Sequence, residues 1–351
     1  MNQSNQSLIS DINNSVDSYS IVYVSLQFFG ILTNLINIII FSNSKLKDPS
    51  YKFTLALSIN SFINLIIGAF RIFISCGPPC SKNRASIYGQ IYLLFIDDFL
   101  TSSLNMNATL IEIYLSLQRL MLIMNRPVLQ KVSAVIFVPI LAAISVVIYI
   151  PIIFIKTIYP IESSNSSSVT YGLRINDFGS STFGKALPTA LTLIRIILVI
   201  GVIFVVNLIT SYKFKKYMDK KHSITNVKKV VPFSTSIKTS NEMKTNNEIS
   251  LIGKKNFEKK NKNLNNSELK TRIKITLMML IKSFSFILGT VPFAVYYILT
   301  NYVDRATLLK MIITSVITMI SSQALDFFIY FIFNNVFRSV AIDLFKSILK
   351  M

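Results

Sequence analysis

The sequence predicts an all-α membrane protein, a seven-transmembrane helix bundle followed by a C-terminal amphipathic surface helix. Hydrophobic residues make up 52% of the 351 residues and charged residues 15%, with a mean hydropathy of +0.54, values outside the range usual for a soluble domain of this length. Seven apolar stretches are each long enough to cross a hydrocarbon layer of ~30 Å as a helix. The Lys and Arg residues outside these stretches divide unevenly between the two sides. These observations predict seven membrane crossings.

The third stretch, residues 88–123, is the span around which the others are expected to pack. At ~1.5 Å per residue, a helix here places Asp97 and Asp98 about 32 Å from Arg119, close to the thickness of the hydrocarbon layer. The residues between these charges include many polar ones: Thr101, Ser102, Ser103, Asn105, Asn107, Thr109, Glu112 and Gln118. Because polar groups in a membrane mostly face other helices or a wet cavity, this helix should lie at the centre of the bundle.

The other six spans follow from the same criterion of apolar length. We place them at about 21–42, 51–75, 133–155, 188–212, 274–299 and 308–333. The fourth carries Pro139 and Pro151, which a bundle tolerates because neighbouring helices satisfy the freed carbonyl groups. With the third span they define a transmembrane domain over residues 21–333. Residues 156–186 are expected to form a polar loop between the fourth and fifth spans.

Residues 1–20 are polar and are predicted to form an extracellular, glycosylated tail. The N-x-S acceptor pattern for N-glycosylation occurs there at Asn2, Asn5 and Asn13, and again in the loop at Asn165. Chance occurrence in a chain rich in asparagine is the alternative explanation.

The basic residues predict which ends of the spans face the cytoplasm. One side of the bundle carries 25 Lys and Arg outside the spans and the other carries 6. The loop 213–273 with the adjoining Lys274 holds 17 of them against 5 Asp and Glu, and is read as a largely disordered cytoplasmic segment. The N-terminus is then outside a plasma membrane and the C-terminus inside. The net charge of +20 would suggest nucleic acid for a soluble chain, but here it suggests contact with anionic membrane lipid.

Residues 334–351 are predicted to form an amphipathic helix on the inner membrane surface. The apolar residues fall on one helical face: Val336, Phe337, Val340, Ala341, Leu344, Phe345, Ile348 and Leu349. The opposite face carries Arg338, Asp343, Lys346 and Lys350. A short helix with this separation of apolar and charged faces is typical of a membrane interface.

The third, sixth and seventh spans each carry a short motif. The motifs read Gln118-Arg119-Leu120 followed by Pro127, then Phe286-Ile-Leu-Gly-Thr290-Val-Pro292, then Asp326-Phe-Phe-Ile-Tyr330. Their order and spacing resemble the rhodopsin-like (class A) family of G-protein-coupled receptors, whose acid-Arg-aromatic, F-x-x-C-W-x-P and N-P-x-x-Y motifs they match in part. Asn34 and Asn60 match that family's polar positions in helices one and two, with Ser61 as a competing alignment for Asn60.

The sequence also departs from that family. It contains no tryptophan, so Thr290 stands where the family's sixth-helix tryptophan responds to ligand. The helix-seven proline is absent, and the second outer loop has no cysteine for the family's disulfide to helix three. Ile320 stands at the position of the retinal-binding lysine, which disfavours a retinal protein. These departures suggest a divergent receptor of invertebrate chemosensory type rather than one of the well-known amine or peptide receptors.

The resemblance implies a set of residues for activation and G-protein coupling: Gln118, Arg119, Leu120, Pro127, Phe286, Thr290, Pro292 and Tyr330. The guanidinium of Arg119 is always charged and has five donors, which suits it to contact helix six or the carbonyl groups of a G-protein helix. Because Gln118 replaces the family's acid, the ion pair that restrains this arginine is missing, and some basal activity is expected. A plain positive anchor at the membrane surface is the alternative for Arg119.

The outer ends of the spans are expected to form a ligand pocket from Asp97, Asp98, Thr101, Asn105, Arg195, Tyr296 and Tyr297. Arg195 would receive an acidic group of the ligand, or would instead snorkel to the outer interface. The two tyrosines would line the pocket or belong to the interfacial aromatic belt.

Asn34, Asn60, Ser322 and Asp326 are expected to form a polar pocket inside the bundle. A carboxylate deep in a span marks a functional site by default, and this pocket would keep one negative charge. It would hold a sodium ion or a proton. A satisfied hydrogen-bond network is the alternative.

Cys76 and Cys80 are the only cysteines, and His222 is the only histidine. The two cysteines lie on the predicted outer side, where a small-loop disulfide can form. A Cys/His metal site or a catalytic Cys-His pair would need residues that the chain mostly lacks, so neither an enzyme nor a metal or cofactor is expected.

The function implied by the resemblance is that of a G-protein-coupled receptor. It would convert an extracellular chemical ligand, a chemosensory cue or a neuropeptide, into activation of a heterotrimeric G protein. The alternative is a ligand-gated channel or transporter of seven-helix type, although no internal repeat of the kind found in transporters is visible.

Overall fold

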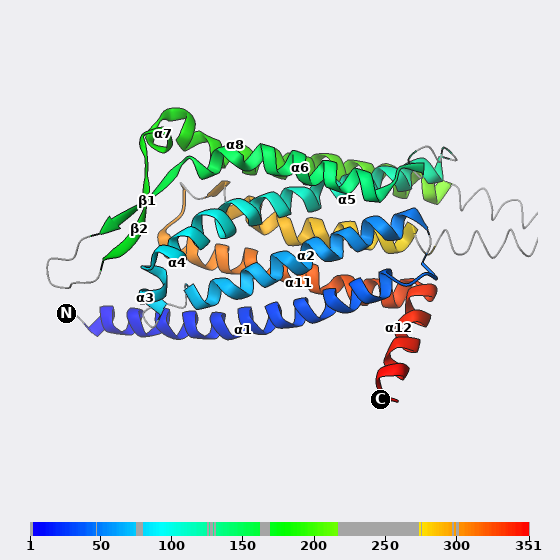
Figure 1. Cartoon of the computed structure of the whole chain (residues 1–351), viewed down its shortest axis with the longest axis horizontal. Coiled ribbons are helices and arrows are strands. Elements are labelled where there is room, and N and C mark those ends of the chain that lie inside the picture. Colours follow the sequence, from blue (N-terminus) through cyan, green and yellow to red (C-terminus); the bar gives the residue numbers. More distant parts are fainter. Residues whose placement is uncertain are drawn as a thin grey trace, which may run out of the picture.

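The described part of the computed structural model comprises residues 3–46, 48–74, 80–124, 126, 129, 131–161, 169–216, 274, 276–296, 298–299 and 302–350. The helices in these ranges run side by side along the long axis of an elongated bundle, and the last helix leaves it at an angle (Figure 1). The predicted fold class, a seven-helix transmembrane bundle with a C-terminal surface helix, is confirmed.

The seven bundle helices follow one another along the chain. The first four are α1 (Gln3–Phe41), α2 (Pro49–Ile74), a third made of α4 (Ile87–Ile91), the π-helical segment η2 (Tyr92–Leu100) and α5 (Thr101–Ile123), and then α6 (Ala134–Ile153). The last three are α8 (Thr182–Ile196) continued by the π-helical segment η4 (Ile197–Phe204) to residue 216, the helix Thr276–Tyr296, and α11 (Arg305–Phe333). The surface helix is α12 (Asn335–Ile348).

The first helix begins earlier than the predicted span. α1 starts at Gln3, so most of the predicted polar tail is helical. Residues 1–29 contain no glycine or proline that would interrupt the helix before the predicted start of the span.

The predicted polar loop over residues 156–186 contains regular structure that was not predicted. The strands β1 (Lys156–Ile161) and β2 (Thr170–Ile175) pair antiparallel, with Lys156 opposite Ile175, and α7 (Asp177–Ser180) follows. β-branched and aromatic residues such as Thr157, Tyr159 and Tyr171 favour this pairing, but the polar composition of the loop obscures it.

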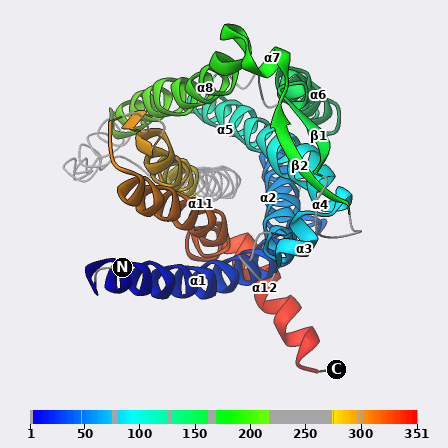
Figure 2. The same cartoon turned by 90° about the vertical axis from the view of Figure 1, so that its left-hand side faces the viewer.

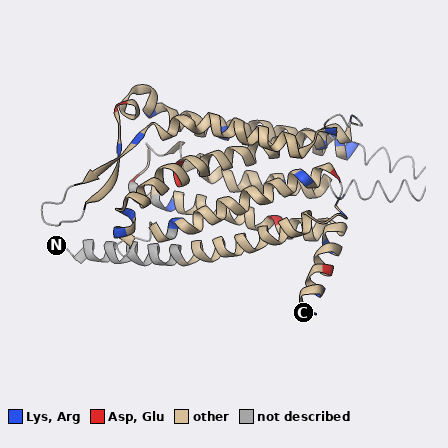
Figure 3. Ribbon diagram, viewed as in Figure 1, with Lys and Arg blue, Asp and Glu red and all other residues tan. Residues whose placement is uncertain are grey.

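The bundle has two distinct ends. The hairpin end carries β1, β2, α7 and the short helix α3 (Ser81–Arg84), and the α12 end carries the surface helix (Figure 1). The fifth helix reaches residue 216 and the sixth begins at Thr276 at the α12 end. The described charged residues gather mostly toward these two ends, with few between them (Figure 3).

The third helix lies where the sequence places it, among the others. Its main segment α5 contacts α2, α6 and the η4 segment, as the view along the bundle illustrates (Figure 2). Six other described helices are long and apolar enough to cross a membrane, whereas α5 is not among them. Polar residues lower its hydropathy, and four of them, Ser103, Asn107, Thr109 and Glu112, are buried within the bundle.

The surface helix is fixed to the bundle by its first turn. The Oδ1 atom of Asn334 accepts hydrogen bonds from the backbone N–H groups of Val336 and Phe337, and its Nδ2 donates to the hydroxyl of Tyr51 at 2.9 Å. The Phe337 side chain is fully buried, with its ring centroid 5.0 Å from that of Phe41 and 5.6 Å from that of Tyr330. α12 therefore starts from a capped, packed corner.

Gly289 lets the sixth and seventh helices approach closely. A Cβ added there would lie 2.7 Å from Cβ of Ser322 and 3.3 Å from the carbonyl oxygen of Thr318. We expect Gly289→Ala to cost about 1–3 kcal/mol of stability, since α11 would have to move. The midpoint of thermal unfolding of the purified protein in lipid nanodiscs measures this.

The control for that prediction is Gly201→Ala in the fifth helix. The nearest atom to an added Cβ there is Cγ2 of Ile197 at 3.8 Å, so this change should be neutral or stabilise by up to about 1 kcal/mol. Equal effects of the two substitutions would contradict the close packing of Gly289 on Ser322.

Candidate functional site

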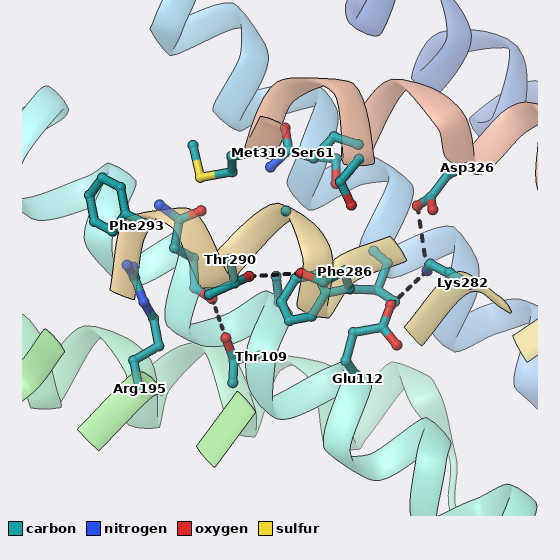
Figure 4. Close-up of a pocket in the computed structure, with 16 residues that line it drawn as sticks. Ser61, Thr109, Glu112, Arg195, Lys282, Phe286, Thr290, Phe293, Met319 and Asp326 are labelled. Atoms are coloured by element: carbon teal, nitrogen blue, oxygen red, sulfur yellow. Dashed lines mark hydrogen bonds and ion pairs between the residues drawn. The ribbon is translucent and has the colours of Figure 1, made fainter. Parts of the chain in front are cut away.

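A buried cluster of three charges joins the third, sixth and seventh helices (Figure 4). Nζ of Lys282 lies 2.9 Å from Oε1 of Glu112 and 3.5 Å from Oδ2 of Asp326. The side chains of Lys282 and Glu112 are 4% and 3% exposed, and that of Asp326 is 11% exposed. We call these residues the ion triad. With two carboxylates and one ammonium, it carries one net negative charge.

Asp326 was predicted from the sequence to belong to a functional site, whereas no role was predicted for Lys282. Lys282 lies close to the basic loop in sequence, where a lysine is typically a membrane-surface anchor. The role of Lys282 could have been predicted because carboxylates buried in a membrane span need a basic partner. Glu112 and Asp326 both lie within spans, and Lys282 is the one cation of the sixth span beyond Lys274. Its ammonium also lies 5.6 Å from the ring centroid of Tyr330.

The four residues predicted to form one polar pocket fall into separate groups. Ser322 and Asp326 line a cavity of about 50 Å³ beside the ion triad, which we call the mid-bundle cavity. Asn34 instead donates to the carbonyl oxygens of Gly30 and Gln323 at 2.9 and 3.2 Å, linking α1 to α11. The volume of the mid-bundle cavity is enough for a few water molecules.

Asn60 likewise lies outside that cavity. Its Nδ2 donates to the carbonyl oxygen of Leu104 at 3.0 Å, and its Oδ1 accepts from Nδ2 of Asn107 at 3.1 Å. Ser61, the competing alignment, lines the mid-bundle cavity. Successive residues of a helix point about 100° apart, and here the rotation of the second helix turns Ser61 rather than Asn60 toward the cavity.

A larger cavity of about 470 Å³ opens at the hairpin end and is lined by residues of all seven bundle helices. We call it the hairpin-end cavity. Five of the residues predicted for a ligand pocket line it: Asp97, Asp98, Thr101, Asn105 and Arg195. Ile320, which stands at the position of the retinal-binding lysine, also lines this cavity.

Two ion pairs lie in the wall of the hairpin-end cavity. Oδ1 of Asp97 is 3.5 Å from Nη1 of Arg71, and Oδ2 of Asp98 is 2.5 Å from Nζ of Lys156 at the start of β1. The second pair ties the hairpin to the third helix. Each carboxylate predicted for this site therefore has a basic partner.

Arg195 lies between the two cavities and lines both. It is 9% exposed, and its guanidinium carbon is 5.6 Å from the ring centroid of Phe293 on the sixth helix. The sequence left open whether Arg195 snorkels to the interface, and the structure places its side chain inside the bundle.

Arg119 is buried near the α12 end without an acidic partner among the described residues. It is 5% exposed, and its Nε and Nη2 atoms have no hydrogen-bond partner in the described structure. The side-chain amide atoms of Gln118 are equally unpartnered. A small cavity lined by Asn207, Thr276 and Ser283 adjoins Arg119.

The other predicted activation residues that the structure describes lie on the third, sixth and seventh helices. Phe286 and Thr290 line the mid-bundle cavity, and the Thr290 hydroxyl donates to the Phe286 carbonyl oxygen at 2.9 Å. Tyr330 is fully buried, with its ring centroid 4.9 Å from that of Phe41. Leu120 and Pro292 are half-buried on their helices.

Several predicted residues lie outside the described part or away from the cavities. Tyr296 does not line the hairpin-end cavity, and its ring lies 6.1 Å from that of Phe293. Cys80 is disulfide-bonded, while its predicted partner is outside the described residues. Asn5 and Asn13 lie on α1. The others outside the described residues are Asn2, Cys76, Pro127, Asn165, Tyr297 and the basic loop between residues 216 and 274.

Comparison with known proteins identifies the fold. No protein-family model and no curated protein matches the sequence. Among solved structures, the crystal structure of squid rhodopsin is similar, with a TM-score of 0.66 at 16% sequence identity over 96% of this chain and 87% of that chain. The chain is therefore a multi-pass membrane protein with the seven-helix fold of a rhodopsin-like G-protein-coupled receptor.

Proposed function

We propose that the chain is a plasma-membrane receptor that converts binding of an extracellular chemical ligand into activation of a heterotrimeric G protein. The observation that carries the proposal is the succession of sites along a bundle with this fold. The hairpin-end cavity lies at one end, the ion triad lies between, and the unpaired donors of Arg119 lie toward the other end.

The sixth helix connects these sites. Phe293 lines the hairpin-end cavity, Lys282 belongs to the ion triad, and Thr276 borders the small cavity beside Arg119. A ligand that binds better when the sixth helix is displaced shifts the population toward the displaced conformation. The size of this shift is set by the difference between the ligand's affinities for the displaced and undisplaced conformations. Displacement at the α12 end would uncover Arg119, whose donors suit the carbonyl groups of a G-protein helix.

The proposed orientation places the hairpin end outside the cell. The basic loop joins the fifth and sixth helices at the opposite end, in accord with the positive-inside rule. The sequons at Asn2, Asn5, Asn13 and Asn165 would then be extracellular. A peptide N-glycosidase should reduce the apparent mass of surface-expressed protein, and a protease added outside intact cells should spare an epitope placed in the basic loop.

The cavity favours a small ligand. Pockets of about 300–1,000 Å³ are typical for small molecules, and the hairpin-end cavity falls in that range. A chemosensory cue or the terminal residues of a neuropeptide would fit it. Ile320 offers no amine for a Schiff base, which supports a diffusible ligand over a covalently held chromophore.

The test is nucleotide exchange on purified heterotrimers. Receptor in lipid nanodiscs is combined with a panel of Gα types and with acids, amines, neutral volatiles and short peptides. We expect at least one heterotrimer to exchange faster with receptor, and faster again with a member of the panel. Ligand-evoked current in cells that lack G proteins, with no effect on exchange, would overturn the proposal in favour of a channel.

A further inference from the structure

The buried cation Arg195 has no ion pair among the described residues. Its residue is 9% exposed, and no described carboxylate oxygen lies within 4.0 Å of it. The guanidinium contacts the ring of Phe293 at 5.6 Å and lines the hairpin-end cavity. A buried charge costs several kcal/mol unless it is paired, so a site for a counter-charge is expected beside it.

The other charges in the cavity wall are already matched. Arg71 is paired with Asp97 and Lys156 with Asp98, which leaves Arg195 as the unmatched charge of the described lining. Glu112 and Asp326 line the adjoining mid-bundle cavity, but both are paired with Lys282 and neither carboxylate lies within 4.0 Å of Arg195, so the net negative charge of the triad forms no ion pair with it. The hairpin-end cavity thus presents one net positive charge at its deep end.

The surroundings of Arg195 combine this charge with apolar walls. The cavity is also lined by Tyr149, Phe293, Val316, Met319 and Ile320. A planar guanidinium binds a carboxylate through two parallel hydrogen bonds, and its stacking against Phe293 limits its orientation. An acidic group at Arg195 would leave the rest of a ligand against these apolar side chains.

We infer that the ligand is a small organic monoanion whose carboxylate binds Arg195 and whose apolar body fills the hairpin-end cavity. The inference rests on the proposed ligand site, and it narrows the ligand class from any chemical cue to acids. It does not require G-protein coupling, so it is tested by binding alone.

The first test is thermal stabilisation of the purified receptor in nanodiscs. The probes are benzoate and straight-chain carboxylates of increasing length, each compared with its primary amide and amine, with sodium chloride as the ionic-strength control. We expect acids alone to raise the unfolding midpoint, by about 5 °C near saturation. Equal stabilisation by amides or amines, stabilisation by chloride, or no stabilisation by any acid would overturn the inference.

The matched variants are Arg195→Met and Arg174→Met, which remove the same charge from a buried and an exposed site. Arg195→Met should weaken acid binding by about 10- to 100-fold, the value of a charged hydrogen-bonded contact. Arg174→Met should leave it unchanged. Acid binding that survives Arg195→Met would overturn the inference.

A second test needs no ligand. If Arg195 lacks a counter-charge in the empty receptor, Arg195→Met should raise the unfolding midpoint of the ligand-free protein, because an uncompensated buried charge is removed. A fall in that midpoint would mean that the arginine already has a structural partner, and would overturn the inference. Both tests can succeed even if the nucleotide-exchange assay fails, so the two proposals fail separately.

Discussion

Replacing Lys282 with methionine is expected to destabilise the protein by about 3–5 kcal/mol, the largest loss we predict for a single substitution. The change removes the one ammonium of the ion triad and leaves Glu112 and Asp326 buried without it. Two neighbouring buried carboxylates both lose their partner and repel each other. The unfolding midpoint in nanodiscs and the fraction of protein that reaches the cell surface measure the effect.

The charge balance of the triad provides the controls. Glu112→Gln or Asp326→Asn leaves a neutral pair with Lys282, so either should cost much less than Lys282→Met. The triple variant Lys282→Met with Glu112→Gln and Asp326→Asn has no buried charge in the triad and should recover most of the lost stability. A Lys282→Met protein as stable as the wild type would contradict the ion triad.

Replacing Arg119 with alanine is expected to reduce receptor-stimulated nucleotide exchange at least tenfold while leaving stability nearly unchanged. The structure gives the reason for this separation: the guanidinium makes no ion pair within the described residues, and two of its nitrogen atoms lack partners. Removing it breaks no ion pair, and the gain from removing an uncompensated buried charge offsets the packing lost when a long side chain becomes alanine. The measurement is the rate of nucleotide exchange on a heterotrimer that the wild-type receptor activates, normalised to surface expression.

The control for Arg119 is Arg126→Ala, an exposed arginine beyond the same end of the third helix. It removes the same charge from the same side of the membrane and should leave exchange largely intact. Normal exchange with Arg119→Ala would favour the alternative in which Arg119 is only a positive anchor.

Much of the bundle was predictable because lipid imposes a simple rule on sequence. Long apolar stretches defined the seven spans, and the third was predicted to be central from its polar residues such as Asn105 and Glu112. Arg195 was identified as a candidate because a charge inside a span is conspicuous. Its position between two cavities was not predictable, since it depends on how the fifth and sixth helices pack.

The features that were missed depend on contacts between distant residues. Lys282 acquires its role only when Glu112 and Asp326 are brought to it from two other helices. The choice between Asn60 and Ser61 depended on helix rotation, which a single motif position does not determine. The pairing of β1 with β2 joins short strands whose composition resembles that of an ordinary polar loop.

The most direct test of the account is the distance between the third and sixth helices at the α12 end. Spin labels on Met124→Cys and Leu277→Cys, both exposed positions, report it by pulsed electron paramagnetic resonance; the disulfide-bonded Cys80 would not react. We expect this distance to lengthen when a nucleotide-free heterotrimer binds. If the receptor accelerates nucleotide exchange on a heterotrimer but the distance stays unchanged when that heterotrimer binds, the proposed displacement of the sixth helix is contradicted.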